Sequence, residues 1–127
     1  MELAAKRFAD TVALYPTGRI DHATADSFKA ALAPHLARVA SGRDRAVIDL
    51  AGVEYISSVG LRVLMLASKQ AKAQGGALAV ADLQPVVREI FEISRFNLVF
   101  QCFGSVREAL TKISPTALAA YDSAHGT

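Results

Sequence analysis

Apolar residues form two kinds of pattern along this chain: short segments bounded by polar or turn-forming residues, and stretches with a helical spacing. Five short segments have the length and composition of strands: Leu3–Phe8, Thr11–Tyr15, Ala46–Leu50, Ala77–Ala81 and Asn97–Phe103. Only Ala9 and Asp10 separate the first two segments, which predicts an N-terminal hairpin. The segment Ala46–Leu50 is apolar except for Asp49, so we expect it to be a buried strand in the centre of a sheet.

Four stretches have the apolar spacing or the end signals of helices. The apolar stripes are Phe28, Leu32, Leu36 and Val39 for a helix over residues 23–39, and Leu61, Leu64, Met65 and Ser68 for one that begins near Ser58 and ends before Gly75. Pro85 opens a shorter third helix, and Ser105 with Glu108 forms a capping box at the start of a fourth. Because proline costs about 3 kcal/mol in a helix interior, Pro34 predicts a local irregularity in the first helix.

The order of these segments predicts an α/β fold with a mixed sheet of about five strands and about four helices. Parallel strands need a crossover connection, so the region from Ala46 to Ala81 predicts a parallel pair covered by a helix. The length of 127 residues and the 52% apolar composition suit one domain with its own core, which we assign to residues 1–113. For residues 114–127 we expect a weakly ordered tail or a short helix.

Two adjacent hydroxyls, those of Ser57 and Ser58, stand where the second helix begins. Serine is a preferred N-cap because its oxygen accepts a hydrogen bond from an otherwise unpaired backbone N–H. The same helix end carries about +0.5 charge, so it would stabilise an anion. From the residues alone, a purely structural capping role is the more common one.

The segment from Val53 to Leu64 resembles the signature of the anti-sigma factor antagonists, the bacterial members of the STAS domain family. In that family a serine of this loop is phosphorylated by a partner kinase, and Ser58 matches the phosphoacceptor, with Ser57 as the alternative. Ser57 stands where the family commonly has aspartate, and Val59 is a second departure. The resemblance implies partner contacts at Ser57, Ser58, Val59 and Gly60.

Two further parts of the chain carry the same resemblance. Gly18-Arg19-Ile20-Asp21 is similar to a second family motif, in which the aspartate lies near the phosphorylation loop and helps to position the partner; Asp21 as the N-cap of the following helix is an equally good interpretation. The segment from Leu83 to Leu110 is similar to the C-terminal half of STAS domains, although Arg95 stands where many relatives have glycine. The resemblance covers residues 3–110 and implies a STAS-like fold.

The resemblance implies that the unphosphorylated protein binds a serine-kinase anti-sigma factor and thereby frees a sigma factor. Phosphorylation of Ser58 would end that binding, a phosphatase would reset it, and ATP would belong to the kinase. Two alternatives stay open: a STAS subunit of a membrane transport assembly, and a partner-switching regulator that does not act on a sigma factor. The second helix is apolar nearly all round, so it needs a second neighbour, either the Val86–Ile93 helix or an external partner beside Ser58. We expect Arg62, on the rim of this helix, to contribute to partner binding.

Composition and motifs argue against other classes of function. The net charge is only +2 and no cluster of basic residues is present, so we expect no direct nucleic-acid binding. No apolar run approaches the ~20 residues that span a bilayer and no signal peptide is recognisable, which predicts a cytoplasmic protein without membrane insertion. Nucleophilic-serine and phosphate-loop motifs are missing, and His22, His35 and His125 lack metal-site spacing, so we expect neither an enzyme nor a cofactor. Cys102 is expected to be a buried, inert thiol.

Overall fold

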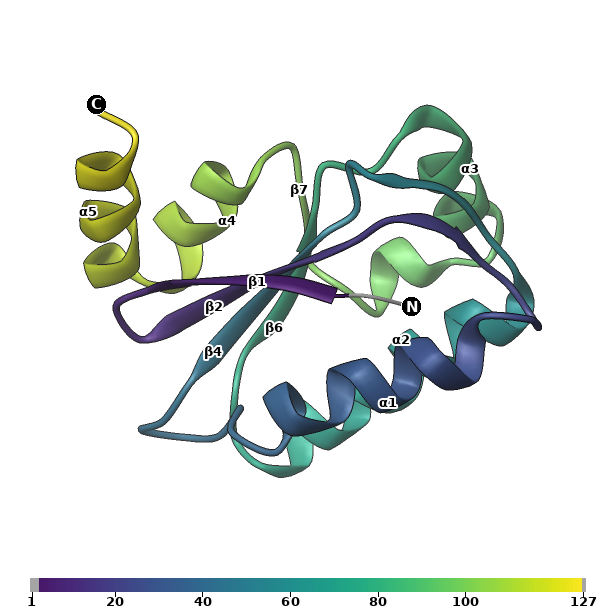
Figure 1. Cartoon of the computed structure of the whole chain (residues 1–127), viewed down its shortest axis with the longest axis horizontal. Helices are drawn as coiled ribbons and strands as arrows, with labels where there is room; N and C mark the ends of the chain where they lie inside the picture. Colours follow the sequence, from purple (N-terminus) through teal and green to yellow (C-terminus); the bar gives the residue numbers. More distant parts are fainter. Residues whose placement is uncertain (1–2, 127) are drawn as a thin grey trace.

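A five-stranded mixed sheet forms the centre of the computed structural model, which describes residues 3–126 (Figure 1). The strands are β1 (Leu3–Phe8), β2 (Thr11–Pro16), β4 (Arg45–Asp49), β6 (Leu78–Ala81) and β7 (Cys102–Phe103), in the order β1-β2-β4-β6-β7. The β1–β2 hairpin is antiparallel, and β2, β4, β6 and β7 pair in parallel. The predicted α/β fold, the hairpin and the parallel strand-helix-strand unit are therefore confirmed.

Helices cover both faces of this sheet (Figure 1). Helices α1 (Ala25–Leu36) and α2 (Ser58–Ala73) pack on one face, while α4 (Val106–Ile113) and α5 (Pro115–Ala124) pack on the other. Successive strand residues point to opposite faces. Ile48 accordingly belongs to the core under α1 and α2, and its neighbour Val47 belongs to the core under α4 and α5. Helix α3 (Pro85–Ile93) begins at its proline, as predicted.

A separate two-stranded sheet, which the sequence analysis missed, joins β3 (Gly18–Ile20) to β5 (Val53–Ile56) in parallel. Both segments were expected to be loops because each is shorter than the runs that periodicity can detect. Ile20 and Ile56 are paired and buried, at 0% and 1% exposure, so this small sheet has its own anchor in the core. It fixes the chain immediately before α1 and immediately before α2.

The ends of two helical regions differ from the prediction. Helix α1 ends at Leu36 rather than at residue 39, and Pro34 lies in its last turn, where its missing N–H removes only one late hydrogen bond. Of the two alternatives for the C-terminal segment, the short helix is the one observed: residues 115–124 form α5, which makes five helices in residues 3–126. Ser114 caps α5 by accepting a hydrogen bond from the Ala117 N–H at 3.1 Å, and the Tyr121 ring packs 5.1 Å from that of Phe8.

The predicted strand over residues 97–103 is wrong for most of its length. Only Cys102 and Phe103 pair with β6, whereas Phe96–Leu98 form a 3₁₀ turn. Arg95, at φ 60°, takes the left-handed conformation that ends α3, although arginine replaces the expected glycine there. Phe100 is 4% exposed and its ring lies 6.3 Å from that of Phe96, so aromatic packing holds this segment away from the edge of the sheet.

Candidate functional site

The backbone at the start of α2 is fixed by the end of β3. The Ser57 N–H donates to the Ile20 carbonyl oxygen at 2.8 Å, which extends the β3–β5 pairing by one bond. The Ser57 hydroxyl then accepts from the Gly60 N–H at 3.3 Å, so Ser57 is the N-cap of α2. Of the two adjacent serines, Ser57 therefore has the capping role.

Ser58 is the first residue of α2 and is exposed to solvent. No hydrogen bond of its hydroxyl is found within residues 3–126, in contrast to that of Ser57. Its Oγ is therefore free for chemistry at the positive end of a 16-residue helix.

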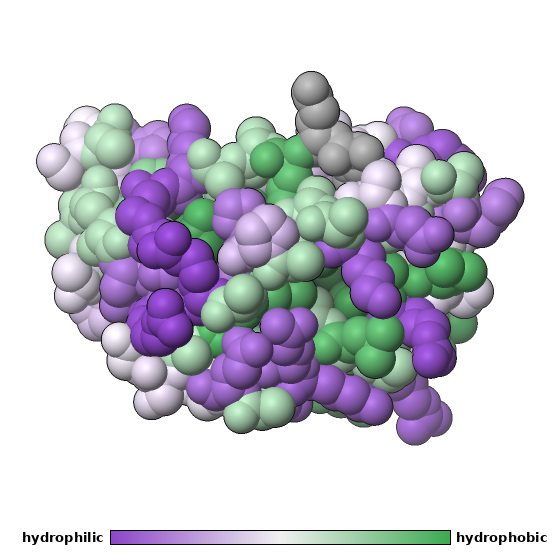
Figure 2. Space-filling view, turned by 60° about the horizontal axis from the view of Figure 1, so that its bottom comes forward, coloured by the Kyte–Doolittle hydropathy of each residue, from purple (hydrophilic) through white to green (hydrophobic). Residues whose placement is uncertain are grey.

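The exposed face of α2 continues from Ser58 along the helix. At 100° per residue, Val59, Arg62 and Leu66 lie within about 100° of Ser58 around the helix axis. Val59 is 45% and Leu66 39% exposed, unusually high values for large apolar side chains, and Arg62 is exposed between them. Figure 2, which turns the α1 and α2 side toward the viewer, shows green apolar patches among purple charged side chains. We call Ser58, Val59, Arg62 and Leu66 the exposed face of α2.

Gly60 allows α2 to begin directly against β3. It is buried, and a Cβ atom built on it would lie 2.8 Å from the Ile20 carbonyl oxygen and 2.8 Å from side-chain atoms of Ile20 and Ile56. Real Cβ atoms essentially never come so close to other heavy atoms. Any other residue would push the helix start away from β3.

Asp21 follows β3 and lies next to the bond between Ile20 and Ser57. Its carboxylate accepts from the Ala23 N–H at 3.0 Å and lies 3.6 Å from the Arg19 guanidinium, which stacks over the Tyr55 ring at 4.4 Å from its centroid. Desolvation would raise the pKa of Asp21, but the backbone hydrogen bonds of Ala23 and Thr24 and the electrostatic interactions with His22 and Arg19 outweigh it and lower this pKa. Asp21 is therefore ionised at neutral pH.

The structure brings the predicted site residues together. Asp21, Ser57, Ser58, Val59, Gly60 and Arg62 all lie at or beside the start of α2. Asp21 does not cap α1, because Thr24 is the N-cap residue there, so the capping interpretation of Asp21 is wrong. The second neighbour of α2 is α1 rather than α3, and Val63 and Leu66 face Leu32 and Leu36 of α1 across a small cavity of about 90 Å³.

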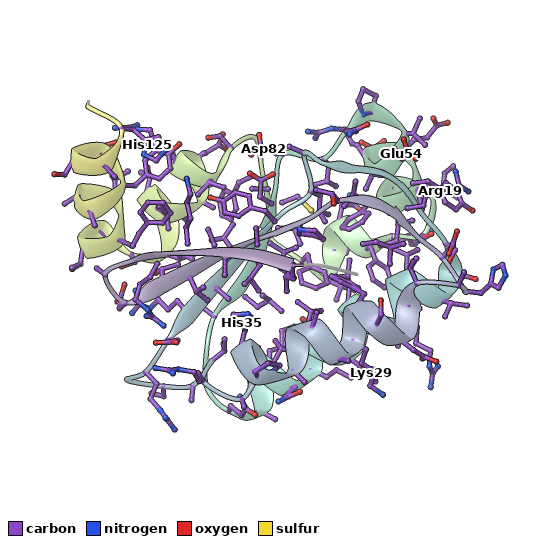
Figure 3. The ribbon with its side chains drawn as sticks, in the orientation of Figure 1. Arg19, Lys29, His35, Glu54, Asp82 and His125 are labelled. Carbon is purple, nitrogen blue, oxygen red and sulfur yellow. The ribbon has the colours of Figure 1, made fainter. Side chains whose placement is uncertain are left out.

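Sequence reasoning missed the Arg19–Tyr55 pair beside this site. These two residues are paired across β3 and β5, and they alternate with the buried pair Ile20 and Ile56. The segments 18–20 and 53–56 are too short for their alternation to have indicated the pairing. Figure 3 shows Arg19 and Glu54 on the side of the molecule next to α3, far from α5 and His125.

A second polar cluster lies at the carboxyl ends of β4 and β6. Asp49, Asp82 and Tyr15 line a cavity of about 560 Å³ together with Tyr121 and His125 of the α5 region. Burial, together with the neighbouring Asp82 carboxylate, raises the pKa of Asp49 to about 6, against the hydrogen bond that it accepts from the Ala51 N–H at 2.8 Å.

Within residues 3–126, no group of three or more His, Cys, Asp or Glu side chains is arranged to hold a metal ion. In the same residues, no helix has the length and apolar character needed to cross a membrane.

Comparison with known proteins shows to which family the chain belongs. The STAS domain family matches residues 2–109, which is most of the chain. The chain belongs to the STAS domain family. Within this family, a Bordetella bronchiseptica protein, BtrV, named as a candidate anti-sigma factor antagonist, is 44% identical over 101 residues, which are 80% of this chain and 84% of BtrV. The predicted family is thus confirmed.

Solved STAS structures share the fold. A structure of a candidate anti-sigma factor antagonist from Thermotoga maritima superposes with a TM-score of 0.79 at 21% identity, over 87% of this chain and 93% of that one. The anti-sigma factor antagonist SpoIIAA superposes in its unphosphorylated form with a TM-score of 0.67 at 15% identity, over 99% of this chain and 98% of SpoIIAA. SpoIIAA of Bacillus has also been solved in a phosphorylated form, with a TM-score of 0.64 at 15% identity, over 88% and 99%. At these identities the likeness concerns the fold alone.

Proposed function

We propose that this STAS protein is an anti-sigma factor antagonist whose binding is switched off by phosphorylation of Ser58. One observation supports the choice of residue above the others: Ser57 caps α2, which leaves the exposed Ser58 hydroxyl without a structural role. The 44% identity to BtrV supports the class of function. In this proposal the protein binds its partner and is modified by it, and it is not itself an enzyme.

The proposed partner is a serine-kinase anti-sigma factor that binds ATP and docks on the exposed face of α2. Val59 and Leu66 offer apolar contact area on that face, and Arg62 offers a positive charge between them. The family relationship supports a phosphatase that removes the phosphate and restores binding. Both partners act in the cytoplasm in this proposal, and neither membrane nor nucleic acid takes part.

The physical basis of the switch is local charge. A phosphate on Ser58 adds about −1.5 to −2 charges and three acceptor oxygens at the start of α2. The helix N-terminus tolerates that charge within the molecule. At an interface the same group, next to the ionised Asp21, must be desolvated against the partner surface. Binding is therefore lost without refolding of the STAS domain.

The direct test combines phosphate mapping with binding. The protein is incubated with ATP and the serine-kinase anti-sigma factors encoded near its gene, and the phosphate is located by mass spectrometry. We expect phosphate on Ser58, unchanged binding by Ser58→Ala, and at least tenfold weaker binding by Ser58→Asp in isothermal titration calorimetry. Ser57→Ala is the matched control, because it removes the neighbouring hydroxyl and costs only about 1 kcal/mol of helix capping.

Full-strength binding by Ser58→Asp would refute the switch. Phosphate on Ser57 would move the modified residue by one position and keep the mechanism. Binding to subunits of a transport assembly, with no phosphate transfer from any kinase, would favour the transport alternative over anti-sigma factor antagonism.

Arg62 is expected to contribute to the same interface. Arg62→Glu should weaken kinase binding about tenfold, because it replaces the positive charge on the exposed face of α2 with a negative one. Surface plasmon resonance measures the affinity, and circular dichroism checks the helix content. Lys112→Glu, which makes the same charge change on α4 at the other face of the sheet, is the control. Unchanged affinity of Arg62→Glu would place Arg62 outside the interface.

A further inference from the structure

A cavity of about 890 Å³ lies beside the outer edge of β6. Its walls come from the C-terminal half of α2, from residues 97–103 and from the end of α4. On one side β6 pairs with β4 along its whole length, including Leu78. On its other side it pairs with β7 only at Val80 and Ala81, so within residues 3–126 Leu78 has no neighbouring strand on that side. The cavity therefore occupies the side of β6 where the predicted strand over residues 97–103 would have paired.

Most of the residues that line this cavity are apolar, and its uncharged polar residues are Ser68, Asn97 and Gln101. Leu78, Phe100, Cys102 and Ile113 line it, and Leu98 lies in its wall while 76% exposed to solvent. The Cys102 side chain is half-buried in this wall, and its burial raises the pKa of the thiol. The volume lies in the range of small-molecule sites, about 300–1,000 Å³. An apolar ligand placed here would cover surface that the fold leaves in contact with water.

The charged residues of the cavity all have one sign. Lys72, in the last turn of α2, and Lys112, in the last turn of α4, line it, and none of its lining residues is aspartate or glutamate. Neither lysine forms an ion pair with another residue of the described part of the chain. Two unpaired ammonium groups beside an apolar cavity complement a ligand with one carboxylate and a hydrocarbon tail.

We propose that this cavity binds a free fatty acid, with the carboxylate between Lys72 and Lys112 and the tail along Leu78, Leu98 and Phe100. The site is separate from the phosphorylation site. Ser58 and Lys72 lie on the same helix, and 14 residues at 1.5 Å each place them about 21 Å apart along its axis. Fatty acid binding is therefore a further activity, which does not depend on the proposed antagonist function.

The single cysteine of the chain provides a direct readout, because Cys102 lines the cavity. The rate of its alkylation by N-ethylmaleimide is measured with and without dodecanoate below the micellar concentration. We expect saturating dodecanoate to slow the reaction at least fivefold and isothermal titration calorimetry to show one site. Dodecyltrimethylammonium and 1-dodecanol, which have the same tail without the negative charge, should bind at least tenfold more weakly.

Matched charge reversals test the lysines. The double variant Lys72→Glu with Lys112→Glu should bind dodecanoate at least tenfold more weakly than wild type. The double variant Lys29→Glu with Lys69→Glu, which makes the same charge change outside the cavity, should stay within twofold. All four positions are exposed, and thermal unfolding verifies that each variant folds.

Non-specific binding to the apolar surface is tested with Ile93→Asp. Ile93 is 76% exposed and does not line the cavity, so this variant should bind dodecanoate like wild type. The proposal is overturned if dodecanoate does not protect Cys102, if both double variants lose affinity equally, if the uncharged or cationic analogues bind as tightly, or if Ile93→Asp abolishes binding.

Discussion

Gly60→Val is expected to lower the free energy of unfolding by about 3 kcal/mol and to displace the start of α2 from β3. Helix propensity alone predicts a small effect of either sign, since glycine is itself about 1 kcal/mol worse than alanine in a helix. The steric effect is larger, because the new Cβ would lie 2.8 Å from the Ile20 carbonyl oxygen and the rigid backbone there cannot move aside cheaply. Urea unfolding measures the loss.

Gly104→Val provides the matched control for this substitution. A Cβ at Gly104 would meet only the flexible end of the Glu108 side chain, at 3.0 Å, so the strain can be relieved by rotation. We expect a change within about 1 kcal/mol. A Gly60→Val protein as stable as the Gly104→Val protein would show that the close approach of α2 to β3 is not required. Kinase binding of Gly60→Val should fall as well, because Asp21 and Ser58 would no longer be held side by side.

Asp49→Asn is expected to stabilise the protein at pH 8 by about 1–2 kcal/mol and to leave it nearly unchanged at pH 4. The pKa of Asp49 is raised from 3.8 to about 6 in the folded protein. The stabilisation that a raised carboxyl pKa gives is present below the unfolded pKa and is lost as pH rises through the folded one. Two pKa units correspond to about 3 kcal/mol, and the half-exposed position of Asp49 reduces this by solvent screening.

Asparagine suits this test because its carbonyl oxygen can still accept the hydrogen bond from the Ala51 N–H. Urea unfolding of wild type and variant between pH 4 and pH 8 gives the difference in slope. Asp26→Asn removes an exposed charge from the first turn of α1 and serves as the control. If wild type and Asp49→Asn showed the same dependence on pH, the shared burial of Asp49 and Asp82 would have no effect on stability.

The elements that could be predicted from the sequence are those with a strong period or a strong cap. The run Ala46–Leu50 and the helix from Ser58 were assigned correctly because burial on both faces and a helical stripe each leave a clear pattern. Residues 97–103 have the composition of a strand, but the packing of Phe96 against Phe91 and of Phe100 against Phe96 overrides that preference. Such a tertiary effect leaves no local signal in the sequence.

The candidate site was found through its motif and not through its geometry. Adjacent hydroxyls at a helix start indicate a cap, but they do not tell which serine caps and which remains free. The register of β3 against β5 decides this, since the Ile20 carbonyl holds the Ser57 N–H and thereby places Ser57 at the N-cap. Three-residue strands are too short for periodicity to reveal, so Arg19 and Tyr55 were missed for the same reason.

The pairing of β3 with β5 also determines at which stage of folding the site around Asp21 and Ser58 forms. Asp21 and Ser58 are distant in sequence and are brought to the same end of the small sheet only when these two strands pair, a non-local contact of the kind that slows folding. During synthesis, Asp21 leaves the ribosome well before Ser58. A kinase that recognises both residues would therefore ignore nascent and unfolded chains, so the pool of modifiable protein would equal the pool of folded protein.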